Sequence, residues 1–178
     1  MFDEKLAVEL QKAFQNSVDS LRKNTGERFY YFGFIFDEGM RPYISAWSYE
    51  AYEKSLKDNS IEEKDKKWWK WDYSDSPYCA YGYDVFFGEV YKILDERAGK
   101  MSVEELYSAE WYTIMSSMEE ALRRLDKADF FGMGDERRQV IVNVEQAPPD
   151  CKEYDRAISL NPPSPLLNEY LAVCEREE

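Results

Sequence analysis

The 178-residue chain contains no histidine, and this absence limits the chemistry it can perform. Histidine is the usual general base of nucleophilic triads, the commonest ligand of catalytic zinc and the ordinary proton shuttle near neutral pH. Enzyme mechanisms that depend on any of these are therefore disfavoured. The sequence also lacks a phosphate-binding loop of the GxxxxGK(S/T) type and a GxGxxG motif, which argues against a nucleotide site.

Cysteine is scarce as well. Cys79, Cys151 and Cys174 are odd in number and widely spaced, and no CxxC occurs, so neither a disulfide framework nor a thiolate zinc site is expected. Cys79 has no histidine and no cluster of cations beside it that would lower the pKa of its thiol. We therefore expect free, buried thiols, and we predict no cofactor and no metal.

Long hydrophobic runs are also missing. No stretch approaches the roughly 20 apolar residues that a membrane-spanning helix needs, and the first residues, Met1 to Lys5, lack the apolar core of a signal peptide. These observations predict a cytoplasmic protein without a membrane partner. Because 44 % of the residues are hydrophobic, the chain can bury a core, and we expect one domain over residues 1–178.

Acidic residues, by contrast, are abundant: the chain has 36 acidic and 23 basic residues, which gives a net charge of -13. Such a charge repels nucleic acid and anionic membranes and attracts a basic partner, although it can also serve solubility alone. Aromatic residues make up 16 % of the chain and include 14 tyrosines, more than a core of this size needs. Tyrosine is favoured at interfaces, so the composition points to binding rather than catalysis.

Hydrophobic patterning predicts a helix followed by a hairpin. Apolar residues recur every three or four positions over 2–21, as on one face of a helix that ends before Gly26. Residues 28–36 are almost entirely aromatic or β-branched and precede a turn and a second strand at 43–47. The first strand is apolar on both faces and should be central and covered by helices, with Gly33 indicating a bulge or the close approach of another backbone.

The rest of the chain is mainly helical in its pattern. Ser102 to Glu105 form a capping box that opens a long helix, and Asp84 is expected to cap a helix that carries Phe87. Residues 139–144 read as a strand, and a last helix begins near Leu166. The order of elements predicts an α+β fold: a small, mainly antiparallel sheet with a central apolar hairpin strand, packed by several helices.

An unusual segment, residues 64–71, interleaves lysines with three tryptophans. The pattern fits core packing of at least two indoles, a protein-binding hot spot, or a platform on which single-stranded nucleic acid stacks. The acidic neighbours Glu62, Glu63 and Asp72 and the overall charge disfavour nucleic acid. Core packing is the favoured interpretation.

Turn-rich segments carry function more often than helix interiors do, so we place the partner-binding site between Trp71 and Asp84. No catalytic residue is predicted. The predicted partner-binding residues are Trp71, Asp72, Tyr73, Asp75, Tyr78, Tyr81, Tyr83 and Asp84.

Several short motifs occur in a recognisable order: an N-terminal helix, the aromatic strand Phe29 to Phe34, the acidic turn at Asp37, then residues 69–73 and residues 160–163. This order resembles a bacterial family of unknown function found among immunity proteins of polymorphic toxin and contact-dependent growth inhibition systems. The stretch 43–48 departs from the family's small-residue and asparagine-threonine pattern. The resemblance implies a cytoplasmic protein that binds and occludes one cognate toxin, often a nuclease.

The sequence leaves three functions open. An immunity protein would oppose a basic nuclease toxin with carboxylates in the places of phosphates. An acidic adaptor or regulatory subunit would have the same surface chemistry. A carboxylate-dependent hydrolase would need a pocket with two facing carboxyl groups of raised pKa; adjacent pairs such as Glu104 and Glu105 point about 100° apart on a helix and read as a solvated face. The oligomeric state is left open.

Overall fold

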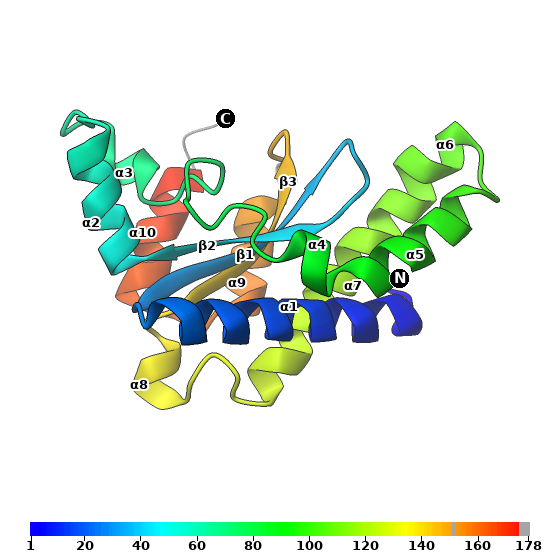
Figure 1. Ribbon diagram of the computed structural model, residues 1–178, viewed down its shortest axis with the longest axis horizontal. Helices are drawn as coiled ribbons and strands as arrows, with labels where there is room; N and C mark the ends of the chain where they lie inside the picture. The colour runs from blue at the N-terminus through cyan, green and yellow to red at the C-terminus, as the bar shows by residue number, and fades with distance from the viewer. Residues whose placement is uncertain (151, 175–178) are drawn as a thin grey trace.

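A computed structural model describes residues 1–150 and 152–174 and shows a three-stranded sheet surrounded by helices (Figure 1). The elements, in chain order, are α1 (Glu4–Thr25), β1 (Phe29–Asp37), β2 (Tyr43–Ser48), α2 (Tyr49–Asp58), α3 (Lys66–Trp69), α4 (Tyr83–Phe86), α5 (Gly88–Ala98), α6 (Val103–Glu105), the π-helical stretch η1 (Leu106–Glu110), α7 (Trp111–Lys127), α8 (Gly134–Arg137), β3 (Ile141–Ala147), α9 (Glu153–Leu160) and α10 (Pro165–Cys174). The predicted α+β class is confirmed.

The sheet has the order β2-β1-β3, so the apolar strand β1 is central, as predicted. The hairpin partner β2 runs antiparallel to β1, with Phe34 opposite Ile44. Strand β3 runs parallel to β1, with Phe34 opposite Val144. The sheet is therefore mixed, and the long helical segment between β2 and β3 provides the crossover that a parallel strand needs.

The residues at the two ends of helix α1 determine where the helix begins and ends. The Asp3 side chain accepts a hydrogen bond from the backbone N–H of Leu6 and caps the first turn. Gly26 ends the helix in the left-handed conformation, with φ of 68°, which costs glycine little. Both ends agree with the predicted helix to within a few residues.

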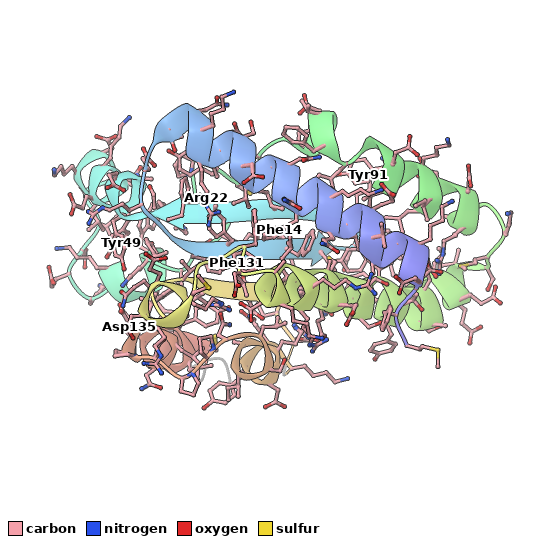
Figure 2. All side chains as sticks on the ribbon, turned by 90° about the horizontal axis from the view of Figure 1, so that it is seen from below. Phe14, Arg22, Tyr49, Tyr91, Phe131 and Asp135 are labelled. Carbon is pink, nitrogen blue, oxygen red and sulfur yellow. The ribbon has the colours of Figure 1, made fainter. Side chains whose placement is uncertain are left out.

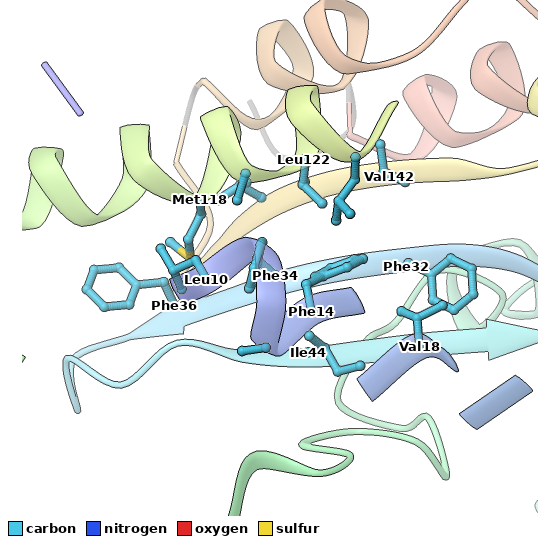
Figure 3. Packing of buried hydrophobic residues seen from close by; sticks show 14 of the residues in the cluster. Leu10, Phe14, Val18, Phe32, Phe34, Phe36, Ile44, Met118, Leu122 and Val142 are labelled. Carbon is cyan, nitrogen blue, oxygen red and sulfur yellow. The ribbon is translucent and has the colours of Figure 1, made fainter. Parts of the chain in front are cut away.

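One face of the sheet packs against α1, α5 and α7 in a dry hydrophobic core (Figure 3). Phe14 of α1 lies 4.7 Å from Phe34 of β1 between ring centroids, and both rings are fully buried. Burying a phenylalanine completely contributes about 1.5–3 kcal/mol. Figure 2 views this face, with Arg22 of α1 and Phe131 labelled. The Arg22 guanidinium lies 5.0 Å from the centroid of the Phe130 ring.

The other face of the sheet is covered by α9, α10 and the chain around Trp71. It buries large aromatic residues, but strand β3 also turns the polar side chains of Asn143 and Glu145 to this side, in alternation with Val142 and Val144 on the dry side. A buried glutamate needs polar partners, because an unpaired buried charge is very costly. This face is therefore where a functional site is expected.

Two predictions about helix starts had different outcomes. The Ser102 capping box is confirmed, and α6, η1 and α7 follow it as one continuous helical segment. The prediction that Asp84 caps a helix carrying Phe87 is wrong. Asp84 lies inside the short helix α4, which Gly82 precedes with φ of 70°, and α5 starts only at Gly88. The helix is interrupted at Phe87, between α4 and α5, and the ring of Phe87 is fully buried in the core.

In the part of the chain that the structure describes, no helix is both long enough and apolar enough to cross a membrane.

Candidate functional site: an acidic, aromatic pocket

The predicted binding segment, residues 71–84, does not form one continuous surface. Asp72, Asp75, Tyr83 and Asp84 are exposed, as a binding surface requires. Trp71 is buried, with 4 % of its surface exposed. The three remaining tyrosines are half-buried: Tyr73, Tyr78 and Tyr81.

Tyr78 and Tyr81 are half-buried because their hydroxyl groups hold the segment to α1 and to the residue just after its cap. Tyr78 donates a hydrogen bond to the Glu27 carboxylate at 2.6 Å. The Tyr81 hydroxyl lies 3.3 Å from that of Ser20 and accepts from the Asn24 amide at 3.0 Å. These two tyrosines engage their polar groups inside the molecule.

Tryptophans of the segment 64–71 also pack inside the molecule. Trp71 is buried, and Trp68 packs against the same cluster of aromatic residues, as the core-packing interpretation predicts. The Lys70 ammonium lies 5.1 Å from the centroid of the Trp71 ring and pairs with Glu169 at 2.8 Å. The three indoles therefore do not stand together as an exposed stacking platform.

A pocket of about 290 Å³ opens beside Trp71, between the loop after α3, the end of β3 and helix α10, segments that can be followed in Figure 1. Its lining combines aromatic rings with carboxyl groups, and the described residues contribute no lysine or arginine to it. The residues that give the pocket its acidic and aromatic character are Trp71, Asp72, Tyr73, Glu145, Glu153 and Tyr170.

Glu145 is the most buried carboxyl group of this pocket, with 4 % of the residue exposed. The hydroxyl of Tyr31 on β1 and that of Tyr170 on α10 both donate to its Oε1 atom, the latter at 2.8 Å. Burial, together with the negative charge of Glu153, raises the pKa of Glu145 to about 8, although the two tyrosine hydrogen bonds favour the ionised form. The desolvation of the carboxylate outweighs the hydrogen bonds.

Gly33 makes the Tyr31 contact possible. A Cβ atom at position 33 would lie 2.2 Å from the Tyr31 hydroxyl oxygen, well inside van der Waals contact. The phenol therefore lies across the glycine to reach Glu145. The group that approaches Gly33 closely is thus a side chain of the same strand, and the predicted approach of another backbone is wrong.

The hydroxyl of Tyr170 joins two carboxyl groups. It lies 2.8 Å from Oε1 of Glu145 and 3.0 Å from Oε1 of Glu153, and it accepts from the Asn143 amide at 2.9 Å. A phenol carries one proton and can donate to only one carboxylate at a time. The second contact is favourable only if that carboxyl group is itself protonated, and the raised pKa of Glu145 favours a proton on that residue.

Among the described residues, Arg156 of α9 forms its ion pair with Asp150 and not with Glu145. Arg156 donates through Nε to the backbone carbonyl of Val144 at 2.7 Å and holds Asp150 with its two terminal nitrogens, at 2.6 and 3.0 Å. Its guanidinium is thus anchored to Asp150, although its charge partly offsets the rise in the pKa of Glu145. The side chains of Glu145 and Glu153 both line the pocket.

Two buried polar atoms at the site have no hydrogen-bond partner among the described residues: the indole nitrogen of Trp71 and Oδ1 of Asn143. Trp71 lines the pocket directly, while the amide nitrogen of Asn143 contacts Tyr170, which also lines it. Buried polar groups are normally paired, and an unpaired one costs about 1–3 kcal/mol. Of these two atoms, only the indole nitrogen belongs to a residue that lines the pocket.

Cys79 and Cys174 are free, as predicted, but they are half-buried rather than fully buried. Burial and nearby Asp72 raise the pKa of the Cys79 thiol, so it is not activated as a nucleophile. Cys174 lines the pocket, and burial raises its pKa to about 12. Cys151 lies outside the described residues. Over residues 1–150 and 152–174, no group of three or more metal-ligating side chains is placed to hold a metal ion.

Sequence comparison places the chain in a family. The family model described as "Domain of unknown function (DUF4303)" matches residues 10–162. The chain belongs to the DUF4303 family. No curated protein and no solved structure matched the chain.

The matched DUF4303 span contains most of the pocket. It includes the strands β1 and β3 and both carboxyl groups, Glu145 and Glu153. Tyr170, whose hydroxyl joins those carboxyl groups, lies beyond the span on α10. The carboxyl pair is thus a feature of the DUF4303 domain of this chain, and α10 completes its hydrogen bonding.

Sequence reasoning placed Trp71, Asp72 and Tyr73 at the site and missed Glu145, Glu153 and Tyr170. One signal was present in β3, where Asn143 and Glu145 alternate with valines in a strand whose two faces are both buried. A buried polar stripe of this kind indicates a functional site better than pairs of adjacent glutamates on exposed helices do.

Proposed function

We propose that this protein is an immunity protein that binds a basic toxin domain, of the nuclease class, and blocks it. The observation that carries the proposal is the pocket, whose lining is aromatic and carboxylate without a basic side chain among the described residues. The net charge of -13 adds long-range attraction for a basic partner. The resemblance of the sequence motifs to immunity proteins supplies the biological setting.

The mechanism of inhibition is occlusion. A nuclease toxin binds phosphates in a basic cleft, and a surface that presents carboxylates can occupy the same cleft. The exposed carboxylates Asp72 and Asp75 lie beside the pocket on the loop after α3. Aromatic side chains next to them supply contact area at low entropic cost, as in interface hot spots.

Under this proposal the toxin is encoded next to the gene of this protein. The association of the two proteins is expected to be tight and sensitive to salt. Raising the ionic strength from about 50 to 500 mM should weaken it by about tenfold or more, because opposed surface charges are screened. The experiment measures affinity by calorimetry across this range and cell survival on co-expression with the toxin.

A matched pair of variants localises the interaction. Asp72→Asn removes a charge beside the pocket while its Oδ1 can still accept the hydrogen bonds from Ser74, and it should weaken binding several-fold. Asp135→Asn removes an equally exposed charge on α8, labelled in Figure 2, and should change nothing. Absence of any complex with the neighbouring product, or equal effects of the two variants, would contradict the proposal.

A second candidate function is favoured by one observation: the Tyr170 hydroxyl lies within hydrogen-bond distance of the carboxyl groups of both Glu145 and Glu153. A general acid–base hydrolase uses two carboxyl groups, one of them with a raised pKa, and burial raises the pKa of Glu145. The test is a panel of aryl glycosides and esters. Turnover that disappears in Glu145→Gln would establish the hydrolase, whereas immunity function predicts no turnover at any pH.

A further inference from the structure

Strand β3 lies at an edge of the sheet, and its one pairing partner among the described strands is β1. The backbone groups of an edge strand that face away from the sheet are able to pair with a strand of another chain. We propose that the side chain of Asn161 seals this edge, and that displacing it lets a second copy of this chain add its own β3 there. The seal does not depend on the proposed function.

The amide group of Asn161 takes the place of a neighbouring strand. The backbone N–H of Val142 donates to Oδ1 of Asn161 at 2.8 Å, and Nδ2 of Asn161 donates to the carbonyl oxygen of Val142 at 2.7 Å. Opposed residues of an antiparallel strand pair exchange the same two bonds. A side chain thus closes the middle of the β-branched run 140–144, where a strand could otherwise pair.

The sequence around Asn161 explains why a side chain has this role. Helix α9, which packs against β3 (Figure 1), ends at Leu160, and Asn161 is extended, as residues before a proline usually are. Pro162 and Pro163 have no N–H group, so their backbone cannot donate to β3. Asn161 is 7 % exposed, and its Nδ2 also donates to the carbonyl oxygen of Ala157 at 2.8 Å. The amide is therefore fixed in place on the edge.

Two arginines extend the seal along the same edge. Arg137 donates through Nη1 to the carbonyl oxygen of Val140 at 2.6 Å and through Nη2 to Oδ1 of Asn161 at 3.2 Å. Arg156 donates through Nε to the carbonyl oxygen of Val144 at 2.7 Å. Alternate carbonyl groups over 140–144 thus each accept from a side chain. Because the seal consists of side chains, one substitution removes its central part and leaves β3 paired with β1.

The sequence of β3 fits a second copy of the same strand. In an antiparallel pair centred on Val142, Val140 of one copy lies opposite Val144 of the other, and β-branched residues pack well across strands. Residues 140–144 contain no charge and no proline, as is typical of segments that pair between chains when an edge is open. The net charge of -13 on each copy opposes this pairing, and salt screens that repulsion.

The test compares the full-length wild-type protein with Asn161→Ala, which removes both bonds to Val142. In dilute solution the Val142 amide of the variant should exchange with deuterium about tenfold faster than in the wild type, or more, as followed by NMR. Ultracentrifugation at rising protein concentration should show a dimer of the variant, populated more at about 0.5 M than at about 0.1 M salt. In that dimer, amide exchange over 140–144 should slow again. The wild-type protein should stay monomeric.

Two further variants complete the comparison. Asn168→Ala, at an exposed position on α10, is the matched control and should keep both the monomeric state and the wild-type exchange rates. Asn161→Asp retains an oxygen that can accept from the N–H of Val142, but it cannot donate to the Val142 carbonyl. It should dimerise with the same salt dependence at higher protein concentration, and it replaces the alanine variant if that variant does not fold.

A folded Asn161→Ala protein that remains monomeric at every concentration and salt would overturn the inference. A dimer in which amide exchange over 140–144 stays fast would do the same, because the copies would then meet elsewhere. The wild-type protein supplies a check that needs no variant: its Val142 amide should exchange as slowly as the amides that pair β1 with β3, and rapid exchange there would show that the edge is not sealed.

Discussion

Replacing Glu145 with glutamine is expected to flatten the pH dependence of the free energy of unfolding between about pH 5 and pH 8. In the unfolded chain this carboxyl group titrates near 4.5, whereas burial and the charge of Glu153 raise its pKa to about 8 in the folded protein. Between these values the folded state holds a proton that the unfolded state has released. Stability contributed by Glu145 is therefore complete below pH 4.5 and is lost as the pH rises to 8.

The expected loss in the wild-type protein over that interval is on the order of 3 kcal/mol, which is a large part of the stability of a typical domain. Glutamine retains an oxygen that can accept from Tyr31 and Tyr170, so the variant should fold. Urea unfolding at a series of pH values measures the effect. Glu104→Gln should reproduce the wild-type slope, and a Glu145→Gln protein with that same slope would show that Glu145 is not buried as a neutral acid.

Replacing Arg137 with alanine is expected to destabilise the protein by about 3–5 kcal/mol, the cost of breaking a buried charge pair. Arg137 is 6 % exposed, and its guanidinium pairs with Asp126 of α7. It also donates to the backbone carbonyls of Val140 at 2.6 Å and Leu160 at 2.8 Å. Alanine would leave these acceptors unpaired in the interior, where each costs about 1–3 kcal/mol.

The neighbouring Arg138 supplies a matched control. Its side chain is about half exposed and pairs with Asp135 at 3.3 Å, so Arg138→Ala should change the free energy of unfolding by less than about 1 kcal/mol. Chemical denaturation of both variants at one pH measures their losses in the free energy of unfolding. Equal, small losses would mean that the Arg137 network does not hold α9 to the sheet, and with it the position of Glu153.

Local patterns predicted the parts of the fold that local forces decide. The four-residue spacing on α1 and its Gly26 end come from contacts within one helix. The unbroken apolar run of β1 predicted a central strand because only a strand covered on both sides can bury every side chain. The direction of β3 was beyond such reasoning, since neighbouring residues do not encode whether a distant strand pairs parallel or antiparallel.

The site was predicted in part for the same reason. Trp71 and Asp72 stood out because tryptophans and acids cluster in a short stretch, and both line the pocket. Glu145 resembled many other glutamates until the fold brought Tyr31, 114 positions away in the sequence, onto its carboxylate. A pKa raised by burial depends on such tertiary contacts, and the hydrophobic pattern of one segment does not show it.

The measurement that tests the central claim most directly is hydrogen–deuterium exchange of this protein, alone and in complex with the basic toxin domain that we propose as its partner. Binding at the pocket predicts that the complex slows amide exchange in the three segments around it, at 68–74, 145–149 and 170–174. Exchange in α8 should stay unchanged. Slowed exchange confined to other surfaces, with the pocket segments unaffected, would contradict the claim that this pocket is where a basic partner binds.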